Sequence, residues 1–179
     1  MNRKLLITLH LYLAAFLAPA ILLVAISGGL YLAGVKGHVE QTGIYRSADS
    51  TLDPEASTLN EDVTALLAEA GVQDYSFEYV KVSGNMLTTR PTSRNHYIVK
   101  IGAGEAEVIA ARPNLQSRMI ELHKGHGPTL FKTYQKGFAI GLALILLSGL
   151  WLGVSAARLR RPTLLTAAAG TIVFALLVI

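Results

Sequence analysis

Residues 5–33 read "LLITLHLYLAAFLAPAILLVAISGGLYLA" and contain no charged side chain and one histidine. Crossing the hydrocarbon core of a bilayer takes about 20 apolar residues, so this stretch is long enough to span it. The apolar core of a cleaved signal peptide has only about 7–15 residues. We therefore predict an uncleaved transmembrane helix within residues 1–34.

Two more apolar stretches lie near the other end of the chain. Residues 138–157 read "FAIGLALILLSGLWLGVSAA", and residues 163–179 read "TLLTAAAGTIVFALLVI". They predict a second transmembrane helix over 134–157 and a third over 163–179. The basic sequence "RLRRP" at 158–162 is expected to form the loop between these two helices.

The charged residues are distributed unevenly along the chain. All 12 acidic residues lie between Glu40 and Glu121, whereas 10 of the 16 basic residues lie between Lys36 and Lys132, so this middle segment carries about −2. The cations outside it flank apolar runs, which is typical of topology signals and lipid-headgroup contacts and not of a nucleic-acid-binding face. Those expected to contact headgroups in the basic loop are Arg158, Arg160 and Arg161.

The same cations predict the orientation of the chain. Arg3 and Lys4 precede the first apolar run, and the basic loop at 158–162 follows the second. The positive-inside rule assigns both to the cytoplasm, which is consistent because an even number of spans separates them. Residues 35–133 are then extracytoplasmic, and membrane lipids are the expected surroundings of the three helices.

The middle segment predicts a small α+β domain. Residues 57–71 have acids in their first turn and end at Gly71, as a helix does. Four strands are expected, because apolar residues alternate with polar ones and turn sequences separate them. Their ranges are 74–82, 86–90, 95–101 and 105–111, with turns at "SGN" and "GAG". A helix over 113–122 should lead back to the membrane.

Small residues recur along the second transmembrane stretch. A helix surface lined with such residues allows another helix to approach closely. The members of this expected packing face are Gly137, Gly141, Ser148, Gly149 and Gly153. Its partner is expected to be another helix of this chain, a second copy of it, or another subunit.

The first two transmembrane stretches also share a short pattern. "AISGGLYLAG" and "LLSGLWLGV" both place Ser-Gly before an aromatic residue. The helices run in opposite directions, so the two patterns should lie in opposite leaflets. They are not expected to form one shared site.

These features together resemble the PepSY-associated transmembrane family. The likeness rests on "LHLYLAAFLAPAILLVAISGGLYL", on the α+β segment, and on "LHKGHGPTLFKTYQKGFAIGLALILLSGLWLG", and it covers nearly the whole chain. It implies a protein of the bacterial inner membrane with a PepSY-like extracytoplasmic domain. Larger members include ferric-siderophore reductases that bind b-type haem through membrane histidines. Small members accompany iron-uptake or electron-transfer systems.

The histidines are the candidate ligands for haem or a metal. They are His10, His38, His123 and His126. His10 lies within the first apolar run, where ionisable residues are costly and often functional. The other three should lie at the outer membrane surface, where three imidazoles can gather and would suit haem iron, zinc or copper. The alternative is that they are ordinary interfacial side chains.

Other catalytic chemistry has no support in the sequence. The chain has no cysteine, which excludes iron–sulfur clusters, covalent c-type haem and thiolate zinc sites. It has no HExxH, GxSxG or phosphate-binding loop, so no catalytic residue is assigned. The chain also departs from the reductases, which have more than three spans. A bis-histidine haem near His10 would need a histidine from a second protomer or another subunit.

The expected function is an accessory role in iron reduction or membrane electron transfer, with b-type haem as the candidate cofactor. The chain is not expected to be an enzyme on its own, but part of a haem-dependent reductase system. The alternative is a non-redox anchor, regulator or structural subunit whose extracytoplasmic domain binds a partner protein.

Overall fold

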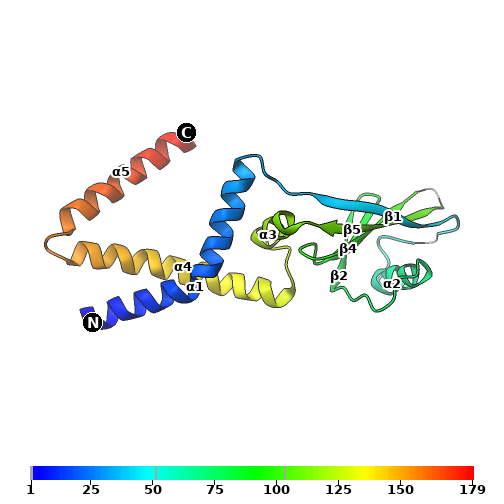
Figure 1. Cartoon of the computed structure of the whole chain (residues 1–179), viewed down its shortest axis with the longest axis horizontal. Helices are drawn as coiled ribbons and strands as arrows, with labels where there is room; N and C mark the ends of the chain where they lie inside the picture. The colour runs from blue at the N-terminus through cyan, green and yellow to red at the C-terminus, as the bar shows by residue number, and fades with distance from the viewer. Residues whose placement is uncertain (1, 51, 103) are drawn as a thin grey trace. The chain divides into compact units, whose positions relative to one another are not determined.

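The computed structural model describes residues 2–50, 52–102 and 104–179. The predicted "GAG" turn includes Ala103, which lies outside the described residues. The chain, shown in Figure 1, divides into two compact units. We call Met1–Ile21 with Lys136–Ile179 the helical unit, and Leu22–Gln135 the sheet unit.

Three helices are long and apolar enough to cross a membrane, as predicted: α1 (Arg3–Leu32), α4 (Thr129–Ser155) and α5 (Arg160–Val178). Very few of their apolar residues are buried within the protein, and α5 buries none. Their surfaces therefore suit a lipid environment, where apolar side chains need no protein cover.

Two boundaries of these helices differ from the sequence prediction. α4 begins at Thr129, directly after Pro128, instead of near residue 134. α5 begins at Arg160, so Pro162 lies in its first turn and the predicted loop at 158–162 is shorter. Proline is tolerated there because the first N–H groups of a helix have no partner within it.

The glycines of α4 differ in what they face. A Cβ added at Gly141 would lie 2.5 Å from Leu17 Cδ1 of α1, and one at Gly153 would lie 2.5 Å from Thr163 Oγ1 of α5. Gly137 would meet nothing within 4 Å among the described residues. Gly141 therefore permits close packing inside the chain, which is one of the predicted uses of this face.

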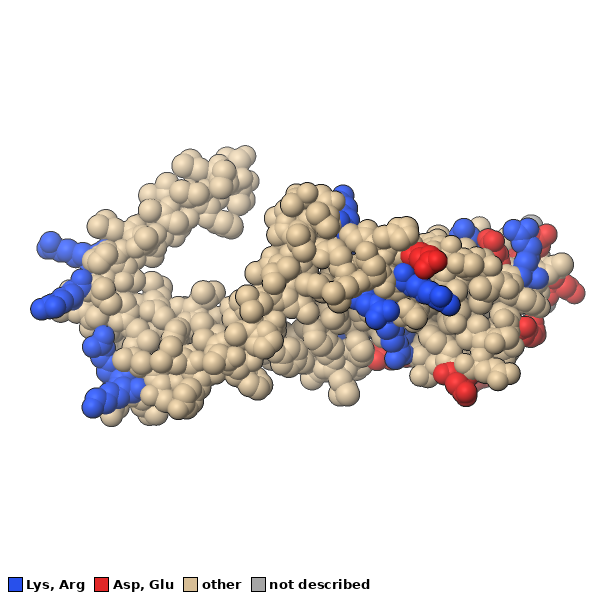
Figure 2. Space-filling view, viewed as in Figure 1, with Lys and Arg blue, Asp and Glu red and all other residues tan. Residues whose placement is uncertain are grey.

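Basic side chains gather at one end of the helical unit, around the start of α1 and the turn from α4 to α5 (Figure 2). Arg158, Arg160 and Arg161 are all exposed there. All acidic side chains lie in the sheet unit instead. The topology signals and headgroup contacts expected of these cations stay predictions.

The sheet unit contains one antiparallel sheet in the order β1-β5-β4-β3-β2. The strands are β1 (Val39–Ser47), β2 (Tyr79–Ser83), β3 (Met86–Arg90), β4 (His96–Ile101) and β5 (Ala106–Pro113). The sequence did not predict β1. It is an edge strand with mostly exposed residues, so it lacks the alternation of a half-buried strand.

The strand predicted over 74–82 is shorter in the structure, since β2 begins at Tyr79. Asp74 has a φ of 55°, outside the strand region. Tyr75 and Phe77 instead stack with ring centroids 6.1 Å apart, and Tyr75 meets Tyr97 edge-on at 4.7 Å. The alternation of aromatic residues thus reflects packing of a loop onto the core.

Helix α2 (Leu59–Glu69) lies within the predicted range 57–71 and supplies much of the core. Its buried residues pack with Leu87, Val99 and Val108 of the sheet. They are Leu59, Val63, Leu66 and Leu67. Helix α3 (Leu115–His123) follows β5, as predicted, and Asn114 caps it by accepting a 2.9 Å hydrogen bond from the Ser117 N–H.

Candidate functional site

His10 contacts the Ser-Gly pair of α4 within the helical unit. Its Nδ1 lies 2.8 Å from the Ser148 hydroxyl oxygen. That hydroxyl donates to the Ile145 carbonyl at 3.1 Å, one turn earlier in the helix. A Cβ added at Gly149 would lie 3.2 Å from His10 Cε1, so the imidazole ring lies against this glycine.

These contacts fix the orientation of the His10 ring. Ser148 has one hydroxyl hydrogen, which either the Ile145 carbonyl or His10 Nδ1 can accept. Where the carbonyl accepts it, the Ser148 oxygen accepts from His10 Nδ1–H and the imidazole lone pair lies on Nε2. His10 Nε2 has no hydrogen-bond partner among residues 2–50, 52–102 and 104–179.

His123 makes an equivalent contact within the sheet unit. Its Nδ1 lies 3.0 Å from the hydroxyl oxygen of Ser27, which is fully buried in α1. Ser27 donates to the Val24 carbonyl at 3.3 Å, and a Cβ added at Gly28 would lie 3.3 Å from His123 Cε1. The same two hydrogen-bond arrangements are therefore open to this ring.

Each Ser-Gly pattern of the sequence thus contacts one histidine, and the two contacts have the same arrangement. In each, serine orients the ring and glycine leaves room for it. The two patterns were not expected to form one shared site, and the structure pairs each with its own histidine. The sequence did not predict these pairs, because 138 and 96 residues separate the partners.

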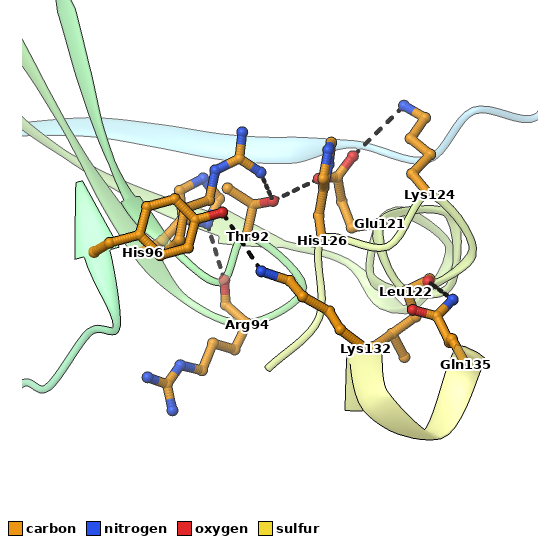
Figure 3. A network of polar contacts seen from close by, with 11 residues as sticks. Thr92, Arg94, His96, Glu121, Leu122, Lys124, His126, Lys132 and Gln135 are labelled. Carbon is orange, nitrogen blue, oxygen red and sulfur yellow. Dashed lines mark hydrogen bonds and ion pairs between the residues drawn. The ribbon is translucent and has the colours of Figure 1, made fainter. Parts of the chain in front are cut away.

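A second polar cluster surrounds Glu121 of α3 (Figure 3). Its carboxylate accepts hydrogen bonds from the Thr92 hydroxyl at 2.5 Å and from His126 Nδ1 at 2.7 Å. Lys124 Nζ lies 3.5 Å away. Arg90 extends the cluster by donating from Nη1 to Thr92 Oγ1 at 2.9 Å. Its buried Nε has no partner among the described residues.

The surroundings shift two pKa values in this region. Burial raises the pKa of Glu121, but the hydrogen bonds from Thr92 and His126 and the nearby cations outweigh it and hold that pKa below its usual value. Burial lowers the pKa of His96, which has an exposed fraction of 6%. His96 Nδ1 lies 2.9 Å from the Arg94 carbonyl, so this histidine is a core residue.

The predicted histidines of the outer surface do not share one set of contacts. His126 pairs with Glu121, and His123 pairs with Ser27. His38 is exposed, and its backbone N–H and carbonyl bind Asn114 at 3.2 and 2.9 Å. No group of three or more His, Cys, Asp or Glu that could hold a metal occurs among the described residues. The expected gathering of three imidazoles is therefore absent there.

Within the sheet unit, other side chains bind the first residues of α4, and the sequence did not predict these contacts. The Glu78 carboxylate accepts from the Thr129 N–H at 2.8 Å and from its hydroxyl at 2.7 Å. It caps a helix that begins 51 residues later. These bonds, the backbone one first, lower the pKa of Glu78. Gln135 adds a 2.7 Å bond to the Leu122 carbonyl.

Comparison with protein-family models, with curated proteins and with solved structures gives no match to this chain.

Proposed function

We propose that this chain is a PepSY-type accessory protein of the bacterial inner membrane that takes part in iron reduction or electron transfer, with His10 as a ligand of b-type haem. The observation that carries the proposal is the His10–Ser148–Gly149 contact. It fixes an imidazole inside an apolar helix and leaves its Nε2 lone pair without a partner among the described residues.

The His10 contact has the form that haem or metal ligation requires. A ligating histidine almost always donates its other ring N–H to an acceptor, which fixes the tautomer and orients the ring. Ser148 is such an acceptor, and Gly149 admits the ring edge. A histidine that served only the membrane interface would not need both residues, and ionisable groups within spanning helices often mark redox or proton pathways.

The residues present offer one protein ligand for haem. His10 would hold the iron through Nε2, and Ser148 would orient the ring. A bound haem would supply one-electron chemistry to the complex. Any further histidine ligand is expected from a partner subunit or a second copy of this chain, packed against the exposed surfaces of the three helices together with membrane lipids.

The distribution of charge supports the proposed location. The basic side chains around the start of α1 and the α4–α5 turn are expected to face the cytoplasm. The sheet domain that connects α1 to α4 would then be extracytoplasmic and PepSY-like. Its acidic residues are consistent with translocation, because they contribute little to topology.

The test is an absorption spectrum of the detergent-purified full chain, expressed with haem supplied, with pyridine extraction to quantify protoporphyrin. We expect a Soret band that His10→Ala abolishes and Ser148→Ala weakens or shifts. His38→Ala is the matched control, because His38 is exposed and binds Asn114 only through its backbone. Wild-type protein without extractable protoporphyrin would refute the haem assignment.

A second candidate function is that of a non-redox anchor or regulator whose extracytoplasmic domain binds a protein partner. The Glu78–Thr129 cap favours it, because this cap links the sheet edge directly to the start of a membrane helix. Crosslinking in whole membranes, with and without Glu78→Gln, tests this function. A partner crosslinked to wild-type protein and lost in the variant would support it, and the same crosslinks in both would count against it.

A further inference from the structure

Beside His123 lies a recess that the haem assignment does not use. Its volume is about 370 Å³, within the range of small-molecule sites. Its lining is largely apolar, and it comes from the last turns of α1 and from α3. The lining residues are Ser27, Gly28, Tyr31, Leu32, Ile120, His123 and Lys124.

The wall of the recess carries an oriented imidazole, His123, beside the cation Lys124. Ser27 holds His123 through Nδ1 at 3.0 Å, which leaves Nε2 for a ligand. His123 is exposed, unlike Ser27, so a ligand can reach it. A suitable ligand therefore needs a hydrogen-bonding group attached to an apolar body.

The recess is also placed for entry from the membrane. Tyr31 and Leu32 are the last residues of a helix that could span a bilayer, and Leu32 is 87% exposed. Lys36 and Lys124 lie 5.4 and 5.8 Å from the centre of the Tyr31 ring, as expected near the headgroup region. An amphiphile with its tail in the lipid would present its polar head to His123.

We propose that this recess binds the head of a membrane quinol. A quinol hydroxyl can donate to or accept from the imidazole, and its flat ring matches a largely apolar wall beside Tyr31. The phosphodiester of a lipid headgroup would match Lys124, and the lipid arm of the test separates it from a quinol. The inference relies on the proposed function only for the membrane location, and not on haem at His10.

The test is a titration of the full chain in nanodiscs of fixed lipid composition with decylubiquinol under anaerobic conditions. Calorimetry and the ¹⁵N chemical shift of His123 Nε2 are the readouts. We expect His123→Gln and Gly28→Leu to weaken binding by about tenfold or more, the equivalent of one good hydrogen bond. Gly28→Leu acts by filling space, since even a Cβ there lies 3.3 Å from the imidazole.

Two sites outside the recess supply matched controls. His38→Gln at an exposed histidine and Gly137→Leu, where a Cβ meets nothing within 4 Å among the described residues, should leave quinol affinity unchanged. Tyr31→Ala is a further lining variant, expected to weaken binding, that keeps the test decisive if Gly28→Leu does not fold.

Two results would overturn the quinol site: equal affinity of wild-type and His123→Gln protein, or displacement of decylubiquinol when phosphatidylglycerol is added to the nanodisc. The second result would assign the recess to lipid headgroups. Because every residue tested for loss of binding lies in the sheet unit, a preparation without haem would leave this inference standing while the His10 proposal failed.

Discussion

The helical unit and the sheet unit place their apolar residues in opposite ways. The helices leave most of theirs exposed, whereas the sheet unit buries Leu87, Val63 and Val99 around α2. In water an exposed apolar helix would be unstable, but a bilayer solvates it. Packing inside the helical unit therefore depends on a few close contacts, and packing in the sheet unit depends on the amount of area buried.

The two histidine contacts are the feature that both units share. Each has a Ser-Gly pair, an Nδ1 bond and a ring edge over glycine. Their surroundings differ, because His10 is half-buried among apolar helix residues and His123 is exposed beside a recess. Under the two proposals, one local arrangement would serve two different ligands, and variants made in one unit at a time test this view.

The largest expected effect is in the core of the sheet unit. Leu87 is 1% exposed, so Leu87→Ala should lower the free energy of unfolding of that unit by about 2–5 kcal/mol. Hydrogen exchange of the β4 amides measures this loss. Val82→Ala, at a site 41% exposed on β2, is the control and should cost far less. Equal losses in the two variants would contradict the assigned core.

A smaller effect is expected where α1 meets α4. Gly141→Leu forces a side chain against Leu17, which is 4% exposed, and overpacking typically costs about 1–3 kcal/mol. Thermal unfolding in detergent, followed by Trp151, the only tryptophan, reports on this unit. Gly137→Leu is the control, since a Cβ there meets nothing within 4 Å among the described residues. A stability unchanged by Gly141→Leu would show that the α1–α4 contact is not important.

The sequence predicted well those features that depend on local composition. The three apolar helices, α2, and the hairpin of β2 and β3 follow from apolar runs, acids in the first turn and "SGN". It missed β1 because an exposed edge strand has no apolar alternation. It overextended β2 because Tyr75 and Phe77 alternate for packing with Tyr97, not for pairing.

The sequence predicted only those features of the candidate site that depend on local sequence. His10 stood out because it interrupts an apolar run, and the two Ser-Gly patterns were visible as a repeat. Their pairing, and the pairings of Glu78 with Thr129 and Thr92 with Glu121, depend on tertiary structure. The expected gathering of His38, His123 and His126 is absent. The ring of His123 contacts Ser27 and that of His126 contacts Glu121, while the exposed His38 binds Asn114 only through its backbone.

The smallest expected effect is on the acid stability of the sheet unit. The pKa of His96 is lowered by burial, so between that pKa and about 6.5 the unfolded chain binds more protons than the folded one. The stability that neutral His96 contributes is complete above pH 6.5. It is lost as the pH falls through the pKa of His96 in the folded protein. Glu121, also lowered, contributes stability that is complete above pH 4.5 and is lost in more acidic solution.

Substitution at His96 separates these two windows. His96→Gln keeps a donor for the Arg94 carbonyl and cannot titrate, so it should flatten the decline of stability just below pH 6.5 and leave the steeper decline below pH 4.5. Denaturant titrations between pH 8 and pH 3, followed by tyrosine fluorescence, measure both. His38→Gln, at an exposed site, should leave the whole profile unchanged. If His96→Gln keeps the decline below pH 6.5, another group causes it and the role assigned to His96 is wrong.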